Sequence, residues 1–171
     1  LLNYVPELND FLFWCQQLFA ESLGKNNKGF IPIISNAPMD HHSLLQLYLG
    51  GPKDKFFYIF SSDIKKNKKI KCKFLGKDIN FLNNKDFDEV KNSQKEAIKT
   101  VFREKKIPFR EIKIKEFNED TLGRLFISFI METIALGKIL KVNPYDQPAV
   151  EQVKILTRRL LASKKSTKKN F

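Results

Sequence analysis

The chain has 171 residues, which is enough for one domain with a single hydrophobic core. Hydrophobic residues make up 42% of it and 16 are phenylalanine, a composition that excludes a disordered chain. No apolar run approaches the roughly 20 residues that a membrane-spanning helix needs. The net charge of +12 would suit a nucleic-acid partner, but only five of the 31 basic residues are arginine. A solvated lysine surface is therefore preferred over nucleic-acid binding.

The sequence begins Leu1-Leu2-Asn3-Tyr4, without an initiator Met or the basic segment of a signal peptide. We expect such a start in the middle of a longer chain. Cys15 and Cys72 lie far apart and have no metal-binding spacing, so reduced thiols in a cytoplasmic protein are expected. The sequence has neither a GxGxxG loop nor a Walker A loop, so no cofactor is expected.

Apolar periodicity predicts the elements of the first third of the chain. Residues 8–19 place their apolar side chains on one stripe of a helix, and Gly24 ends it. The short apolar run 30–34 suggests a strand, although it contains a proline. A helix is predicted over 43–49. The continuous apolar run 56–60 is typical of a strand buried on both faces of a parallel sheet.

Strand and helix patterns alternate again further along the chain. Residues 70–74 alternate apolar groups with lysines, which predicts a half-buried strand at a sheet edge. Asp86-Phe87-Asp88-Glu89 reads as a capping box that opens a helix reaching about residue 106. Residues 109–117 contain the alternation of a further strand.

Two helices are predicted to complete the chain. Asn118 caps a long helix that passes through the apolar segment 125–140 and stops before Pro144. The last helix is predicted over 148–162, and a lysine-rich tail, 163–171, follows it. Strands that alternate with helices predict an α/β fold, a three-layer αβα sandwich around a mainly parallel sheet. Residues 1–162 are expected to form this one domain.

Two segments of the sequence resemble one known family. The first is WCQQLFAESLGK at 14–25, followed by DHHSLLQLYLGGP at 40–52, and the second is GKILKVNPYDQPAVEQVK at 137–154. Both are similar to the glucose-6-phosphate isomerase family, in its compact bacterial version. The resemblance runs from Tyr4 to about Leu161 and is weakest over 63–84. It implies a sugar-isomerase (SIS) domain, the second of the two that family members have.

The resemblance implies roles for five side chains. Glu21 matches the catalytic base of the family, and His42 matches the histidine of ring opening, which a neighbouring subunit usually supplies. Lys154 matches the lysine near the ring oxygen of the sugar. Gln17 and Gln147 match glutamines that contact the substrate. No metal ligand is implied.

These residue types suit aldose–ketose isomerisation. One carboxylate can take a proton from C2 of the sugar and return it to C1, through a cis-enediol(ate). Hexose phosphates are mostly cyclic, so a separate acid–base group must first open the ring, and histidine titrates near neutrality. A lysine can supply positive charge near the developing enediolate.

Each assignment also has a simpler interpretation. Glu21 precedes Lys25 by four residues, so the two could form an ordinary i,i+4 ion pair at a helix end. His42 could be only a helix N-terminal residue, and neighbouring His41 competes for its role, although the family usually has Gln at that position. Lys154 is one of many lysines, and Gln147 could merely begin a helix.

The family's first SIS domain supplies a Ser/Thr-rich phosphate loop and an arginine, and neither has a counterpart in this sequence. The expected partners are therefore a sugar phosphate, an N-terminal SIS domain and a second copy in a homodimer that donates His42 across subunits. Neither nucleic acid nor a membrane is expected as a partner. We expect the chain to be inactive alone. The alternative is a non-catalytic SIS-type module that binds a sugar phosphate.

Overall fold

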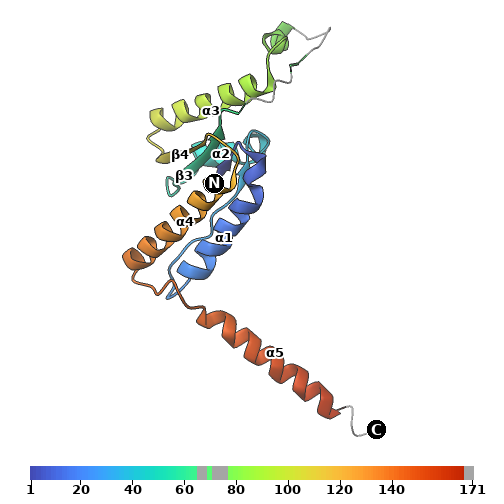
Figure 1. Ribbon diagram of the computed structural model, residues 1–171, viewed down its shortest axis with the longest axis vertical. Helices are drawn as coiled ribbons and strands as arrows, with labels where there is room; N and C mark the ends of the chain where they lie inside the picture. The colour runs from blue at the N-terminus through green and yellow to red at the C-terminus, as the bar shows by residue number, and fades with distance from the viewer. Residues whose placement is uncertain (65–68, 71–76, 168–171) are drawn as a thin grey trace. The chain divides into compact units, whose positions relative to one another are not determined.

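The structure is a computed structural model that describes residues 1–64, 69–70 and 77–167 (Figure 1). Its elements, in chain order, are β1 (Leu2–Asn3), η1 (Pro6–Leu8), α1 (Asn9–Leu23), β2 (Ser35–Asn36), α2 (His41–Gly50), β3 (Phe57–Ser62), η2 (Lys77–Leu82), α3 (Phe87–Glu104), β4 (Phe109–Ile114), α4 (Glu119–Leu140) and α5 (Pro148–Thr167). The labels η1 and η2 denote short 3-10 helices.

The chain divides into two compact units, which are described separately. The sheet unit comprises Leu1–Gln16 and Pro32–Ile127. The helical unit comprises Gln17–Ile31 and the chain from Ser128 onward. Helices α1 and α4 each contribute their first part to the sheet unit and their last part to the helical unit.

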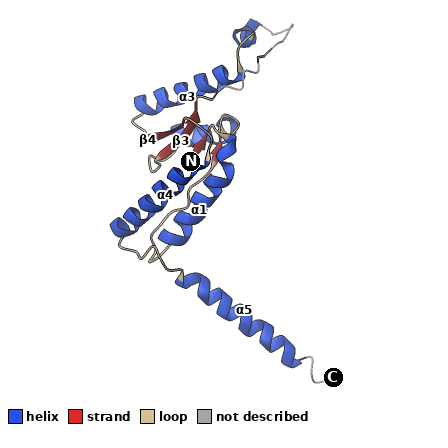
Figure 2. Cartoon of the chain, in the orientation of Figure 1, coloured by secondary structure: helices blue, strands red, loops and turns tan. Residues whose placement is uncertain are grey.

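The sheet unit contains four parallel strands in the order β2-β1-β3-β4, shown in red in Figure 2. The longest pairing joins β3 to β4, with Phe57 opposite Phe109 and Ser62 opposite Ile114. Strand β1 has only two residues but lies between β2 and β3. Because all the strands are parallel, their carboxyl ends meet at one edge of the sheet.

Helices cover both faces of this sheet. On one face Phe57 and Ile59 of β3 pack in a buried cluster with Ile98 and Phe102 of α3, and the Phe57 and Phe102 rings lie 4.7 Å apart. On the other face Phe60 meets the ring of Phe11 from α1 at 6.3 Å. Burial of alternate side chains on opposite faces confirms the predicted α/β class with helix layers around a parallel sheet.

The two helix caps predicted from the sequence, Asp86 and Asn118, are present in the structure. Asp86 precedes α3, and its carboxylate accepts a hydrogen bond of 2.9 Å from the backbone N–H of Asp88. Asn118 precedes α4, and its side-chain oxygen accepts one of 2.9 Å from the backbone N–H of Thr121. Side-chain acceptors at these positions satisfy N–H groups that the first helical turn leaves without backbone partners.

Some predicted elements differ from the structure. The strand suggested for 30–34 is found slightly later, at Ser35–Asn36, past the proline in that run. Of the predicted edge strand 70–74, only Ile70 is described, and it is not in a strand; residues 71–74 lie outside the described residues. Helix α5 extends to Thr167 rather than ending at 162. The division into a domain at 1–162 and a tail at 163–171 stays a prediction.

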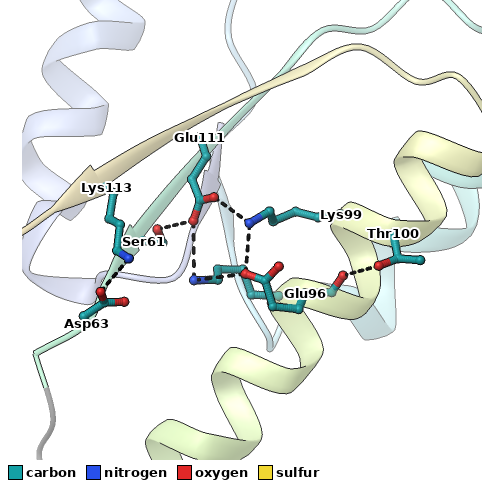
Figure 3. Close-up of polar contacts among 8 residues, drawn as sticks. Ser61, Asp63, Glu96, Lys99, Thr100, Glu111 and Lys113 are labelled. Carbon is teal, nitrogen blue, oxygen red and sulfur yellow. Dashed lines mark hydrogen bonds and ion pairs between the residues drawn. The ribbon is translucent and has the colours of Figure 1, made fainter.

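A buried ion-pair network joins α3 to β4 (Figure 3). Lys95 and Lys99 of α3 are only 5% and 8% exposed, so they depart from the expectation that the lysines are solvated. Lys99 pairs with Glu111 of β4 at 2.6 Å and Lys95 does so at 3.4 Å. The hydroxyl of Ser61 on β3 donates to the same carboxylate at 2.6 Å. Two buried lysines thus neutralise a strand carboxylate.

Candidate active site

Glu21 lies in the last turn of α1, on the side away from the apolar stripe of that helix. Phe19 and Leu23, its neighbours two residues before and after, are almost fully buried, whereas Glu21 is exposed. Gln17 lies one turn earlier on the same face, four residues away, where helical side chains meet. The amphipathic pattern of α1 therefore presents Gln17 and Glu21 together.

Two glutamine amides hold the Glu21 carboxylate. Gln17 Nε2 donates to Glu21 Oε1 at 3.0 Å, and Gln147 Nε2 donates to Glu21 Oε2 at 2.9 Å. Gln17 is local to the helix, but Gln147 is 126 residues further along the chain. Each carboxylate oxygen receives one donor and keeps a lone pair for another group, such as a substrate hydrogen. Three of the predicted site residues are thus brought together in the helical unit.

Gln147 reaches Glu21 because a turn after α4 folds back towards the end of α1. The N–H of Tyr145 donates to the Asn143 side chain at 3.1 Å, and the Asn143 amide donates to Asp146 at 3.0 Å. Gly137 of α4 allows the turn to approach, because a Cβ there would lie 3.2 Å from ring atoms of Pro144. We refer to Asn143–Gln147 as the site turn.

Lys25 connects the end of α1 to the site turn. Its ammonium forms an ion pair of 2.9 Å with Asp146 and donates hydrogen bonds to the backbone oxygens of Ser22 and Asn143. The hydrogen bond from Lys25 also lowers the pKa of Asp146 below its ordinary value. The simpler interpretation, an i,i+4 pair between Glu21 and Lys25, is wrong, since Lys25 pairs with Asp146 instead.

Lys154 lies in the second turn of α5. Its ammonium pairs with Glu151 of the same helix at 2.7 Å, and both side chains are largely exposed. The structure therefore places Lys154 in the helical unit with Glu21 but gives it a local partner rather than joining it to the Glu21 carboxylate.

The two histidines begin α2 in the sheet unit, directly after β2 at the carboxyl edge of the sheet. His41 is partly buried, and its Nε2 lies 2.9 Å from the hydroxyl of Tyr4. Burial lowers the pKa of His41, against the opposing charge of Asp40. His42 is exposed. His41 is thus engaged by a core tyrosine, while His42 faces solvent.

Sequence reasoning assigned no role to Asp146 or Asn143, although both stand inside the quoted motif. The signal that could have found them is the opposite charge of Lys25, at the end of the first quoted segment, and Asp146, within the second. A lysine just past the end of one helix and an aspartate just before another suit a cross-link between those ends.

No group of three or more His, Cys, Asp or Glu side chains that could hold a metal ion occurs in residues 1–64, 69–70 and 77–167. In the same ranges, no helix is both long and apolar enough to cross a membrane.

Known proteins are similar in sequence to this chain over nearly its whole length. A probable glucose-6-phosphate isomerase of Methanococcus maripaludis is 32% identical over 99% of the chain. The glucose-6-phosphate isomerase of Methanocaldococcus jannaschii is 34% identical over 94% of it. The chain covers 38% and 40% of these two relatives, about two fifths of their length. No family model matches the chain.

Solved structures share the fold. A hypothetical protein from Thermus thermophilus superposes with a TM-score of 0.81 at 27% identity, over 94% of this chain and 40% of that one. A glucose-6-phosphate isomerase from Chlamydia trachomatis gives a TM-score of 0.68 over 96% of this chain and 34% of its own; at 15% identity it supports the fold alone.

The parallel sheet, its helix layers and these structural neighbours define an α/β protein with the sugar-isomerase fold. The family resemblance read from the sequence is confirmed: the chain is related to the glucose-6-phosphate isomerases and corresponds to a C-terminal-type portion of them, not to their full length.

Proposed function

We propose that this chain is the C-terminal catalytic portion of a glucose-6-phosphate isomerase, which interconverts glucose 6-phosphate and fructose 6-phosphate. The observation that supports this most is the Glu21 carboxylate between the amides of Gln17 and Gln147. A carboxylate oriented by two neutral donors keeps its negative charge available for proton abstraction. The names of the relatives point to the same reaction.

In the proposed mechanism, His42 acts first. It exchanges a proton with the ring oxygen and the C1 hydroxyl, so that the cyclic sugar opens to its aldehyde form. Lys154 supplies positive charge near the ring oxygen during this step. His42 lies in the sheet unit and Lys154 in the helical unit. We propose that a second copy of the chain in a homodimer donates His42 to the site.

Glu21 then moves the proton between carbons. Its carboxylate takes the proton from C2 of the open sugar, which leaves a cis-enediolate, and returns that proton to C1, while the hydroxyl proton passes between the two oxygens. One carboxylate serves both steps because C1 and C2 are adjacent. The amides of Gln17 and Gln147 fix the direction of its lone pairs and can contact sugar hydroxyls.

The remaining portion of the relatives is proposed as the partner that completes the site. Glu21, Gln17 and Gln147 are all exposed in this chain, and an enediolate needs a site that excludes water. An N-terminal SIS domain would cover these groups and hold the sugar phosphate. We therefore expect the chain to be inactive alone, and the complete isomerase to act in glycolysis and gluconeogenesis in the cytoplasm.

The test replaces Glu21 with glutamine in a reconstituted isomerase, meaning this chain together with the remainder of the sequence that its relatives have. Glutamine keeps the shape of glutamate but cannot accept the C2 proton. Because a general base contributes about 10²–10⁴-fold, kcat for fructose 6-phosphate should fall by about that factor. The control is Glu104→Gln, an exposed glutamate at the end of α3, which should leave kcat unchanged.

Retained turnover in Glu21→Gln would contradict the proposed base. If turnover were retained and a sugar phosphate still raised the melting temperature of this chain alone, the non-catalytic binding module would be the better description.

A further inference from the structure

Lys25 has three N–H donors, and each meets an acceptor of the helical unit. The acceptors are the Ser22 carbonyl at 3.1 Å, the Asn143 carbonyl, and the Asp146 carboxylate at 2.9 Å. The side chain of Lys25 is only 10% exposed, unlike the solvated lysines that dominate the surface. A lysine that uses all its donors in a mostly buried place is held in one geometry.

The acceptors belong to the two segments that carry the site. Ser22 lies next to Glu21 in the last turn of α1, where backbone carbonyls lack helical partners. Asn143 and Asp146 belong to the site turn, and Asp146 is adjacent to Gln147. Lys25 therefore connects the residue after Glu21 to the residue before Gln147.

From this geometry we propose that Lys25 and Asp146 are positioning residues, which hold Gln147 at the Glu21 carboxylate by fixing the site turn against the end of α1. This inference rests on the proposed function for its kinetic consequence. Lys25 does not contact the Glu21 carboxylate, so its effect must pass through Gln147. A displacement of about 1 Å at a reacting group can cost about 10²-fold in rate.

The first test is kinetic and uses the reconstituted isomerase. Lys25→Met removes the ammonium but keeps most of the side-chain volume, and we expect kcat to fall by about 10–100-fold with KM changed less than about threefold. Asp146→Asn removes the ion pair from the other side and should act in the same direction. If Lys25→Met fails to fold, Asp146→Asn provides the kinetic test instead.

Lys28 offers a matched control. Its ammonium donates to the Leu140 carbonyl at 2.8 Å, so it also links the segment after α1 to the end of α4, but it does not touch the site turn. Lys28→Met should leave kcat within about twofold of the unsubstituted enzyme, because surface substitutions away from the site have small effects.

A double-mutant cycle distinguishes positioning from general support of the fold. If Lys25 acts through Gln147, then Lys25→Met should lower kcat by less than about threefold in a Gln147→Ala background. An equal loss in both backgrounds, or no loss in the unsubstituted background, would overturn the proposal.

A second measurement uses this chain alone and needs no turnover. Hydrogen exchange of the Tyr145 amide, which bonds to Asn143 within the site turn, should become at least about tenfold faster in Lys25→Met. The Ile59 amide of β3 should be unchanged. Unchanged exchange at Tyr145 would overturn the proposal. If Glu21→Gln kept its turnover, the proposed function would be wrong, and the exchange result would still decide whether Lys25 holds the turn.

Discussion

Glu111 of β4 is a strand carboxylate that faces two lysines of α3. Burial disfavours its charged form, but hydrogen bonds from Lys99 and Ser61 and the charge of Lys95 outweigh burial and lower the pKa of Glu111 to about 2 (Figure 3). Its ordinary value is 4.5. A carboxyl with a lower pKa in the folded state stabilises the fold above its unfolded value, and this contribution is lost as pH falls from about 4.5 through about 2.

Glu111→Gln should therefore destabilise the chain at pH 7 by about 3 kcal/mol, because it leaves the buried Lys95 and Lys99 with only the exposed Glu96 as a counter-charge. The difference in free energy of unfolding from the unsubstituted chain should shrink below pH 4.5 and nearly vanish at about pH 2. Urea unfolding at several pH values measures this.

The control for Glu111 is Asp63→Asn, which breaks an exposed pair with Lys113 at the end of β3. The hydrogen bond from Lys113 lowers the pKa of Asp63 too, but the pair is exposed and screened by solvent, so this variant should change the pH curve much less than Glu111→Gln does. A difference between Glu111→Gln and the unsubstituted chain that does not change with pH would contradict the role given to the Glu111 charge.

Some contacts between the site residues could be predicted from the sequence, and others could not. Gln17 and Glu21 are four residues apart on one helix, so helical periodicity alone predicts that their side chains meet. Gln147 is distant in sequence, and only the family resemblance assigned it to the same site; its hydrogen bond to Glu21 came from the structure. The partner of Lys25 could not be predicted locally, because Glu21 and Asp146 are both acidic and only the fold decides which is nearer.

At the scale of an element, α4 carries two glycines with different surroundings. A Cβ built at Gly123 would meet nothing within 4 Å, whereas one at Gly137 would lie 3.2 Å from the ring of Pro144. Glycine weakens a helix because it loses more backbone entropy on folding than other residues. Only at Gly137 is that cost offset by close approach of the site turn.

Gly123→Ala should stabilise the chain by about 0.5–1 kcal/mol, because alanine favours the helix and has room. Gly137→Ala should lose most of that gain, and Gly137→Val should push Pro144 away and lower kcat of the reconstituted isomerase. Urea midpoints and turnover measure the two effects. Equal stabilisation by both alanine substitutions would show that the contact with Pro144 does not constrain position 137.

Elements that depend on neighbouring residues were predicted from the sequence, whereas elements that depend on distant segments were not. The caps Asp86 and Asn118 act on the next few residues, so they were found directly from the sequence. Strand β1 was missed because two residues carry no periodic signal. It becomes a strand through its pairing with β2 and β3, which are more than 30 residues away.

At the scale of the whole molecule, α5 carries a stripe of exposed apolar side chains. Val153, Leu156 and Leu160 lie on one side of the helix and are 64%, 55% and 65% exposed. A helix whose apolar side remains in water gains little from packing. Since the chain spans only 38% and 40% of the two relatives compared above, we propose that the remaining portion covers this stripe.

Leu156→Glu with Leu160→Glu should therefore weaken association of this chain with the remaining portion by at least about tenfold, because the two charges would be buried without partners. Size-exclusion chromatography or calorimetric titration of the two purified portions measures this. Ile155→Glu is the matched control, since Ile155 is also exposed but lies on the opposite side of α5. An equal effect of the control would contradict a specific role for the stripe.

The sequence by itself determined the α/β class, the caps, most helices and the family, because periodicity, capping chemistry and motifs are local properties of the chain. Through the motif it also proposed Glu21, Gln17 and Gln147 as site residues. Only the tertiary structure decided that Lys25 pairs with Asp146, that Lys95 and Lys99 are buried against Glu111, and that β1 is a central strand. These features depend on which distant segments pack together, and every residue type involved has several equally suitable partners along the chain.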